Sequence, residues 1–424
     1  MRSLGRSGFW LCVLIPLVLT GCMFQDLRRN LATMHEYAVL RGTVRTDHAT
    51  DLPILVVVYS GETGREKLVD DFVLAGPGPY FFLVPAGDYR LAAFEDVNRT
   101  FTYQPGEDPA ALLRGGELIT VVSGATVEGL DIEIRGAGRE RVPFVFTSSG
   151  TEESGARSLA EFHLGEVTSM DDPRFSDENA RRGLWQPADF LTQVGAGVYF
   201  LEPYDPQKIP VLFIHGALGQ PRNFATLISR LDRNRFQPWL VYYPTAVSLT
   251  ATATFLDRWM QYLYVQHHYP RLAVVAHSMG GLVARAFVNR VIASNDGRSD
   301  GMRLFFTMST PWDGLAAAQR GVDRAPVVAP SWYDVATGSP FQRSLLDTAL
   351  PPTLGHDLLF SFAGGSRQMG EANDGVVTVA SQLEPRVQSH ARTVRGFNET
   401  HTSILESGEV SALLNAELAV VTAK

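Results

Sequence analysis

The stretch VVAHSMGGLVARAF, Val274 to Phe287, places a serine between an apolar run and a helical pattern. Leu272 to His277 has the continuous apolar character of a parallel strand that is buried on both faces. After Gly280, apolar residues recur at helical spacing. We therefore expect Ser278 on a tight strand-to-helix turn at the carboxyl end of a parallel strand, where ligands bind in open α/β sheets.

The residues around Ser278 match the G-x-S-x-G pattern of a nucleophile turn, except that Ala276 replaces the first glycine. Alanine adds only a methyl group, and Gly280 and Gly281 keep the other side of the turn small. A helix that begins at Met279 would direct its positive end toward an anion formed near the serine. The pattern favours a nucleophilic serine over a purely structural one.

Strand and helix patterns alternate on both sides of this turn. VLFIHG, PWLVYYP and LFFTMS are apolar runs typical of strands, and FATLISRL places its apolar residues on one helical face. This alternation predicts an α/β domain with a mostly parallel, doubly wound sheet over residues 189–424.

The first third of the chain has a different pattern. Between residues 37 and 137, short β-prone runs such as LPILVVVY and YRLAAFE are separated by turn residues. These runs predict a small antiparallel β-sandwich, as a second domain within 424 residues. Residues 138–188 are polar and irregular, and we expect a linker and lead-in there.

The chain begins like an exported protein. Arg2 and Arg6 precede the apolar segment FWLCVLIPLVLT, which is short for a membrane span and ends in LTGC. LTGC resembles the lipobox of bacterial lipoprotein signals, which implies cleavage after residue 21 and acylation of Cys22. Residues 22–36 would then be a lipidated N-terminus and tether. An ordinary secretory signal or a membrane anchor is the alternative.

Composition excludes some classes of partner and chemistry. Lys and Arg total 37 against 45 for Asp and Glu, a net charge of −8, and no basic run suggests nucleic-acid binding. Only Cys12 and Cys22 are present, so loss of the signal leaves no internal disulfide. An aspartate directly after the cysteine would resemble an inner-membrane retention signal of lipoproteins. Met23 stands there instead, and this resemblance therefore implies the outer membrane. We expect no cofactor and no metal, and protein partners stay open.

Four stretches together resemble the α/β-hydrolase superfamily, and within it bacterial lipases and esterases: VLFIHGALG, VVAHSMGG, MSTPWDG with GSPF, and ANDGVV with ETHTSIL. Some of those enzymes also carry alanine where Ala276 stands. In the N-terminal part, PYFFLVPAGDYRLAAFED resembles the carboxypeptidase-regulatory or transthyretin-like sandwich. The first resemblance implies a serine nucleophile followed in the chain by an acid and then a histidine.

That order selects the other catalytic candidates. Of the histidines after Ser278, His401 directly follows the last predicted strand, whereas His356 comes too early and His390 is the second choice. For the acid we favour Asp374 in ANDGVV over Asp313 in TPWDG, which could instead cap a helix.

The resemblance also implies an oxyanion hole, made by the backbone N–H groups of Met279 and Ala217. His215 and His277 are expected to be structural. Residues 314–355 form a predicted cap, whose aromatic side chains could either line an acyl site or pack within the cap.

The expected function is a membrane-anchored serine hydrolase that cleaves carboxylic esters of acyl or lipid type. Acyltransferase, thioesterase or amidase activity on the same triad is the first alternative. A non-catalytic surface-binding lipoprotein is the second. Acyl length, alcohol group and oligomeric state are left open by the sequence.

Overall fold

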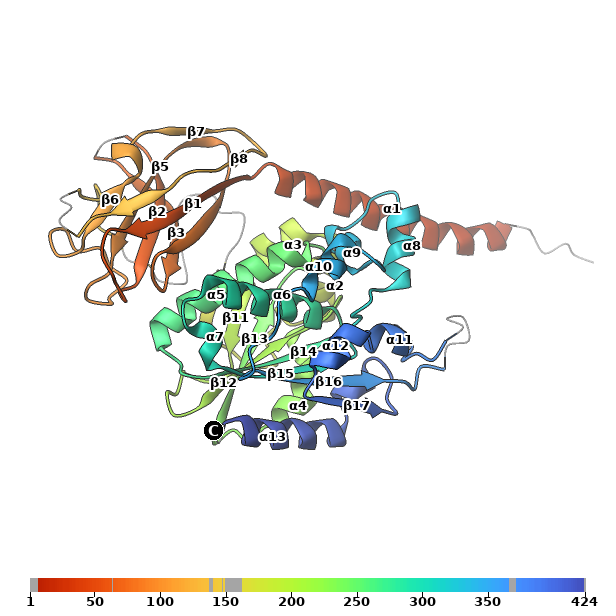
Figure 1. Ribbon diagram of the computed structural model, residues 1–424. Helices are drawn as coiled ribbons and strands as arrows, with labels where there is room; N and C mark the ends of the chain where they lie inside the picture. The colour runs from red at the N-terminus through yellow and green to blue at the C-terminus, as the bar shows by residue number, and fades with distance from the viewer. Residues whose placement is uncertain are drawn as a thin grey trace, which may run out of the picture.

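The computed structural model describes residues 7–62, 64–136, 140–146, 148, 162–365 and 371–422. A long helix is followed by two small sheets and then by a large α/β domain (Figure 1). The N-terminal elements are α1 (Ser7–His35), β1 (Ala38–Thr46), β2 (Ile54–Ser60), β3 (Lys67–Leu74), β4 (Gly78–Val84), β5 (Gly87–Glu95), β6 (Ala110–Leu112), β7 (Ile119–Val121), β8 (Thr126–Val127) and β9 (Ile132–Ile134).

The two small sheets form a sandwich, as predicted. One has the order β4-β1-β8, with β9 also on β1, and the other has the order β3-β2-β5-β6, with β7 on β5. Leu40 and Phe82 of the first sheet and Val56 and Leu91 of the second belong to one buried cluster. The sandwich is not purely antiparallel, because β1 pairs in parallel with both β8 and β9.

The α/β domain is built on a sheet of eight strands in the order β10-β11-β13-β12-β14-β15-β16-β17. Adjacent strands from β13 to β17 are parallel, whereas β11 pairs antiparallel with β13. The strands are β10 (Phe162–Val167), β11 (Ala196–Phe200), β12 (Ile209–Ile214), β13 (Phe236–Tyr242), β14 (Leu272–His277), β15 (Met302–Met308), β16 (Gly355–Ser361) and β17 (Thr393–Phe397). This architecture confirms the predicted α/β fold class.

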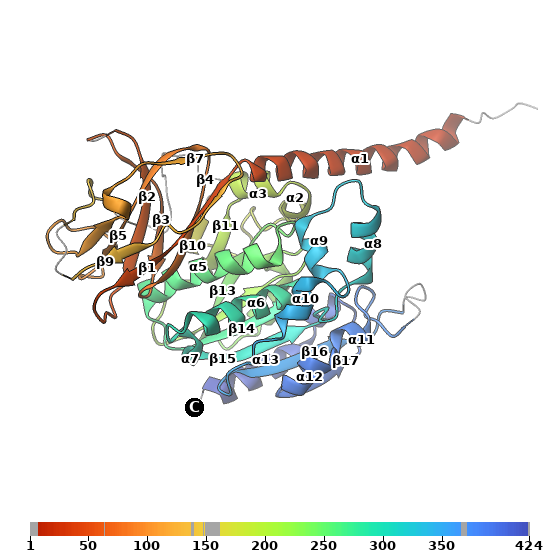
Figure 2. The same cartoon turned by 45° about the horizontal axis from the view of Figure 1, so that its top comes forward.

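Helices cover both faces of this sheet (Figure 2). α5 and α6 lie on one face, and α4 and α13 on the other (Figure 1). The helices are α2 (Asp177–Trp185), α3 (Pro187–Gln193), α4 (Ala225–Ser229), α5 (Leu249–His267), α6 (Met279–Ser294), α7 (Arg298–Gly301), α8 (Ala316–Arg324), α9 (Pro330–Val335), α10 (Pro340–Leu345), α11 (Val379–Gln382), α12 (Pro385–His390) and α13 (Gly408–Thr422). The predicted cap region contains α8, α9 and α10, between β15 and β16.

Residues 138–188, expected to be a linker, contribute elements to the α/β domain. β10 adds an edge strand beside β11, and α2 packs near the end of β13, with Gly183 accepting a hydrogen bond from Ala246. Composition hid these elements because an edge strand and a short, polar helix bury few apolar side chains.

The segment expected to be a tether, residues 22–36, lies in helix α1 up to His35 and packs against the α/β domain. Leu27 is fully buried in a cluster with Leu184, Ala246 and Ala329. Asn30 and Asp189 exchange two hydrogen bonds, from Asn30 Nδ2 to Asp189 Oδ2 at 3.1 Å and from Asp189 N to Asn30 Oδ1 at 2.8 Å. In the part of the chain that the structure describes, no helix is long and apolar enough to span a membrane.

The sandwich packs on α5 through one charged contact and several aromatic ones. The Arg258 guanidinium donates to Asp70 Oδ1 at 2.7 Å and to the Asp71 carbonyl oxygen. The rings of Phe81 and Phe255 meet edge to face at 5.2 Å. β3 carries both aspartates and was not predicted, because two consecutive charges break the alternation of a strand.

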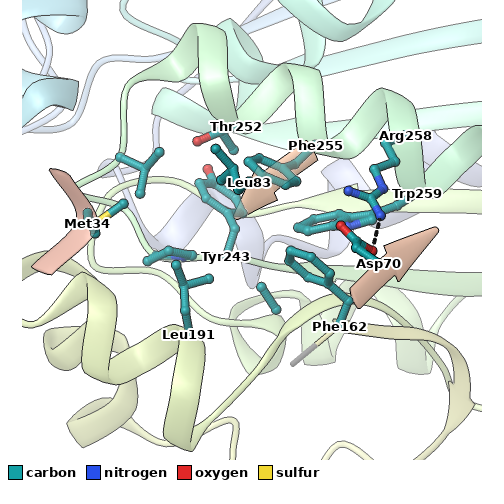
Figure 3. Close-up of a pocket in the computed structure, with 13 residues that line it drawn as sticks. Met34, Asp70, Leu83, Phe162, Leu191, Tyr243, Thr252, Phe255, Arg258 and Trp259 are labelled. Carbon is teal, nitrogen blue, oxygen red and sulfur yellow. Dashed lines mark hydrogen bonds and ion pairs between the residues drawn. The ribbon is translucent and has the colours of Figure 1, made fainter. Parts of the chain in front are cut away.

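A cavity of about 60 Å³ lies between the sandwich, α1 and the α/β domain (Figure 3). Its walls are mostly apolar and include Phe162, Phe255 and Trp259. Arg258 and Asp70 form an ion pair at one side of it (Figure 3). Neither Ser278 nor His401 lines this cavity, so it is separate from the candidate active site.

Candidate active site

Ser278 lies between the end of β14 and the start of α6, as predicted. Its backbone has φ 55° and ψ −133°, which is unfavourable for a side chain with a Cβ, and its N–H donates to Met308 O at 2.8 Å. Such strain costs about 1–3 kcal/mol and persists only where the surroundings enforce it. The turn therefore holds the serine at the carboxyl edge of the sheet.

Close packing around the turn explains which neighbours must be small. A Cβ on Gly280 would lie 2.3 Å from Ile214 O, and a Cβ on Gly216 would lie 2.7 Å from the Cβ of Ser278. Ala276 is fully buried within β14, in register with Ile214 and Thr307 of the neighbouring strands. The sheet accommodates its methyl group, whereas glycine is required after the serine.

Ser278 and Asp374 both hydrogen-bond to the ring of His401. His401 Nε2 lies 2.8 Å from Ser278 Oγ, and His401 Nδ1 lies 2.8 Å from Asp374 Oδ2. An ionised carboxylate can only accept, so the proton is on Nδ1 and Nε2 is free to accept from the serine hydroxyl. This is the arrangement that activates a serine.

The Asp374 carboxylate is buried, and its oxygens accept several hydrogen bonds from other groups of the protein. Its Oδ1 accepts from the N–H groups of Val376 at 2.9 Å and Val377 at 2.7 Å. Burial acts to raise the pKa of Asp374, but the hydrogen bonds and charge of His401 and these backbone donors outweigh it, so the pKa is lowered. The carboxylate therefore stays ionised beside the histidine.

Two further side chains hold the same carboxylate, and sequence reasoning missed them. Ser361 Oγ donates to Asp374 Oδ2 at 2.9 Å, and Gln382 Nε2 donates to it at 3.2 Å. Ser361 is the last residue of β16, the strand that precedes the acid. The only sequence signal for Ser361 was its position as a polar residue at the end of an apolar strand. No sequence signal pointed to Gln382.

The main chain of His401 is held from both sides. Its N–H donates to Asp374 O at 2.9 Å, and its carbonyl oxygen lies 2.7 Å from His277 Nε2. Burial, with a smaller contribution from His401, lowers the pKa of His277 to about 3. His277 is therefore neutral, donates to His401 O, and positions the base without touching the serine hydroxyl.

Of the predicted oxyanion donors, Met279 directly follows Ser278, and Ala217 follows Gly216, which packs closely against Ser278. Met279 is the first residue of α6, and first-turn N–H groups have no acceptor within the helix. Ala217 follows β12 in a loop whose Leu218 N–H donates to Thr245 Oγ1 at 3.4 Å and whose Gly219 N–H donates to Gly216 O at 3.0 Å. The neighbouring donors of this loop are thus occupied.

His215 is part of the support of that loop. Its Nδ1 lies 2.9 Å from Gly216 O, and its ring stacks on Tyr243 at 4.4 Å. Tyr243 Oη in turn donates to His215 O at 2.6 Å. Burial lowers the pKa of His215 to about 4, so it is neutral at physiological pH.

The remaining catalytic candidates lie away from this chain of hydrogen bonds. Asp313 is exposed, and its N–H donates to Ser381 O. His390 is exposed at the end of α12, whereas His356 is buried, with Nε2 2.9 Å from Thr307 Oγ1. Of the aromatic residues near and within the cap, Trp312 is buried against Phe305 and His356.

A serine on a strand–turn–helix elbow of a mostly parallel sheet, followed along the chain by an acid and a histidine, is the arrangement of α/β-hydrolases. The C-terminal domain has the α/β-hydrolase fold. Residues 250–334 of it match the family described as "Putative serine esterase (DUF676)". The match includes Ser278 and ends before Asp374 and His401.

Solved structures similar to part of this chain include the mature lipase BlEst2 of Bacillus licheniformis, at 17% identity and a TM-score of 0.42, over 53% of this chain and 97% of that one. Phospholipase PlaB from Legionella pneumophila matches at 19% identity and a TM-score of 0.35, over 41% of this chain and 45% of that one. No curated protein matches the chain. In the described ranges, no group of three or more potential ligands could hold a metal ion.

Proposed function

We propose that the α/β-hydrolase domain is a serine esterase that cleaves carboxylic esters of acyl or lipid type through an acyl-enzyme. The observation that carries the proposal is the hydrogen-bonded sequence Ser278 Oγ, His401 and Asp374, with 2.8 Å at each step. The matched serine esterase family, within the same domain, supports the reaction class.

In the proposed mechanism, His401 Nε2 takes the proton of Ser278 as Oγ attacks the acyl carbonyl. The resulting oxyanion accepts hydrogen bonds from the N–H groups of Ala217 and Met279, and removing one such donor typically costs ~10²–10³ in rate. His401 then returns the proton to the departing alcohol, which leaves the acyl group on Ser278. Water, deprotonated by the same nitrogen, attacks the acyl-enzyme; His401 then passes that proton to Ser278 Oγ as the bond to the acyl group breaks and the acid is released. Asp374 holds the histidine tautomer throughout.

The proposal is tested by covalent labelling and by substrate length. We expect a fluorophosphonate probe to label the wild-type protein but not Ser278→Ala, and p-nitrophenyl esters of graded chain length to be hydrolysed. An unlabelled but folded wild-type protein would leave only a binding function. Faster transfer of the acyl group to an added alcohol or amine than to water would instead identify an acyltransferase.

We also propose that Cys22 is acylated and anchors the protein to a bacterial membrane, more specifically the outer one. The proposal is supported by the leader with its LTGC end and by the exposed position of Cys22 on α1. Stable anchoring requires more than one acyl chain, as in a lipoprotein.

We expect metabolic labelling with a fatty-acid analogue to mark the wild-type protein and not Cys22→Ala, and the substituted protein to leave the membrane fraction. A wild-type protein that stays unlabelled contradicts the anchor. It leaves the esterase proposal untouched, because all the proposed catalytic groups lie on the α/β-hydrolase domain.

A further inference from the structure

We infer that α1 acts as a rigid strut that turns the carboxyl edge of the large sheet, with its catalytic groups, toward the surface of a lipid bilayer. The inference rests on the proposed acylation of Cys22 and adds an orientation to it. A flexible tether would let the anchored enzyme face any direction. A docked helix fixes one direction.

The first support is the way in which α1 is held. Leu27 fills a buried cluster, Asn30 and Asp189 are joined by two hydrogen bonds, and Gln186 Nε2 donates to Asp26 Oδ2 at 2.9 Å. Asn30 is only 1% exposed, so its amide would be costly to leave unpaired. These contacts restrain both the position of the helix along its axis and its rotation.

The second support is the direction in which the helix points. Phe24 packs edge to face on Trp185 at 5.4 Å, and Trp185 packs on Trp332 of α9 at 6.0 Å. Cys22, two residues before Phe24, is exposed. In both views α1 runs past α9 and α8 toward its N-terminal end (Figures 1 and 2), and in the acylated protein the helix would begin at Cys22. The acylation site is therefore beside the cap.

The third support is the character of the side chains on this edge. Leu218 after β12, Phe362 after β16 and Val376 beside the acid are 48%, 43% and 42% exposed, and Tyr333 of α9 is 54% exposed. The first three follow carboxyl ends of parallel strands, so they share an edge with Ser278. Apolar side chains around an active-site edge suit the boundary between headgroups and acyl chains.

The fourth support is charge, which favours a lipid surface as the partner. α8 lies beside the middle of α1 (Figure 2) and exposes Arg320 and Arg324, with Asp323 as the acidic residue between them. Arg28 is exposed on α1 itself. The protein as a whole has a net charge of −8, so basic groups next to the anchor stand out against it. Guanidinium groups there would bind anionic lipid headgroups.

Orientation can be measured with a single introduced thiol. Once Cys22 is acylated and the leader is removed, no free cysteine is left. Tyr333→Cys would place a fluorophore on the cap, and Asn234→Cys would place one just before β13, at the opposite edge of the sheet. The acylated protein is reconstituted into phosphatidylethanolamine–phosphatidylglycerol vesicles that contain a nitroxide-labelled lipid.

We expect the nitroxide to quench the fluorophore at position 333 several-fold more than the one at position 234. Equal quenching in vesicle-bound protein would overturn the orientation while leaving the anchor intact. Protein that is unacylated and unbound would overturn both the anchor and the orientation. Hydrolysis of a soluble short-chain ester, measured in parallel, reports separately on the proposed esterase activity.

A second experiment detaches α1 from the α/β domain. Leu27→Asp should undock α1, whereas Gln25→Ala, on the exposed side of the same helix, is the matched control. We expect Leu27→Asp to keep its acylation, its membrane fraction and its turnover of soluble esters, but to hydrolyse vesicle-embedded esters about tenfold more slowly. An unchanged rate on vesicles would show that docking of α1 does not orient the enzyme. Asn30→Ala, a smaller change, serves if Leu27→Asp does not fold.

Discussion

Ser278→Ala and His401→Ala are each expected to lower ester turnover by about 10⁶, and Asp374→Asn by about 10⁴, with little change in stability. The serine hydroxyl and the imidazole act in one proton transfer, at 2.8 Å from each other, so loss of either removes the whole step. The carboxylate of Asp374 can only accept from His401 Nδ1, whereas the side-chain amide introduced by Asp374→Asn can also donate to it. The substitution would therefore favour the histidine tautomer that is protonated on Nε2, which cannot take the proton of the serine. The measurement is kcat on a soluble p-nitrophenyl ester.

The most specific part of this prediction is that the rate losses of the two substitutions do not add. The double variant Ser278→Ala with His401→Ala should be scarcely slower than Ser278→Ala alone. Asp313→Asn and Ala276→Gly are the controls, because Asp313 is exposed and the sheet already accommodates the methyl group of Ala276; both should retain activity. Loss of activity in Asp313→Asn with retention in Asp374→Asn would move the acid to the end of β15.

Removing residues up to about 137 is expected to lower the melting temperature of the remaining chain by roughly 10 °C or more. The linker that the sequence predicts at residues 138–188 would leave a hydrolase domain that folds and acts independently after this cut. The structure changes the expected result, because the cut exposes Phe255, which contacts Phe81 of the sandwich, and Tyr262, which contacts Phe101. It also opens the site that Leu27 fills.

Thermal unfolding and size-exclusion chromatography of the truncated and full-length chains would measure this effect. A second truncated chain carrying Phe255→Gln and Tyr262→Gln is the matched control and should be less prone to aggregate. Below its melting temperature the truncated protein should still hydrolyse soluble esters, since all the proposed catalytic residues lie beyond β11. A truncated chain that melts with the full-length protein would show that the two parts are independent.

The fold class of the large domain could be predicted because its signals are local. Strands buried on both faces appear as uninterrupted apolar runs, and the small residues around Ser278 reflect a turn that leaves no room for a Cβ at Gly280 or Gly216. The order of motifs along the chain then placed Ser278, Asp374 and His401 after three different strands of the sheet, β14, β16 and β17. The distances and angles that join them were not in the sequence.

Contacts between distant segments were decided by the tertiary structure alone. Asp313 and Asp374 both follow strands of the parallel sheet, and only packing brings the carboxylate of Asp374 to 2.8 Å from His401 Nδ1. The sequence did not predict the strand β3, because Asp70 and Asp71 interrupt its apolar pattern. The residue that pairs with these charges, Arg258, is almost two hundred residues away in the chain. The sequence by itself determined the strand-to-helix turn and the candidate residues, since these depend on neighbours in the chain. The docking of α1 depends on Leu184, Asp189 and Ala329, and no periodicity within α1 specifies such remote partners.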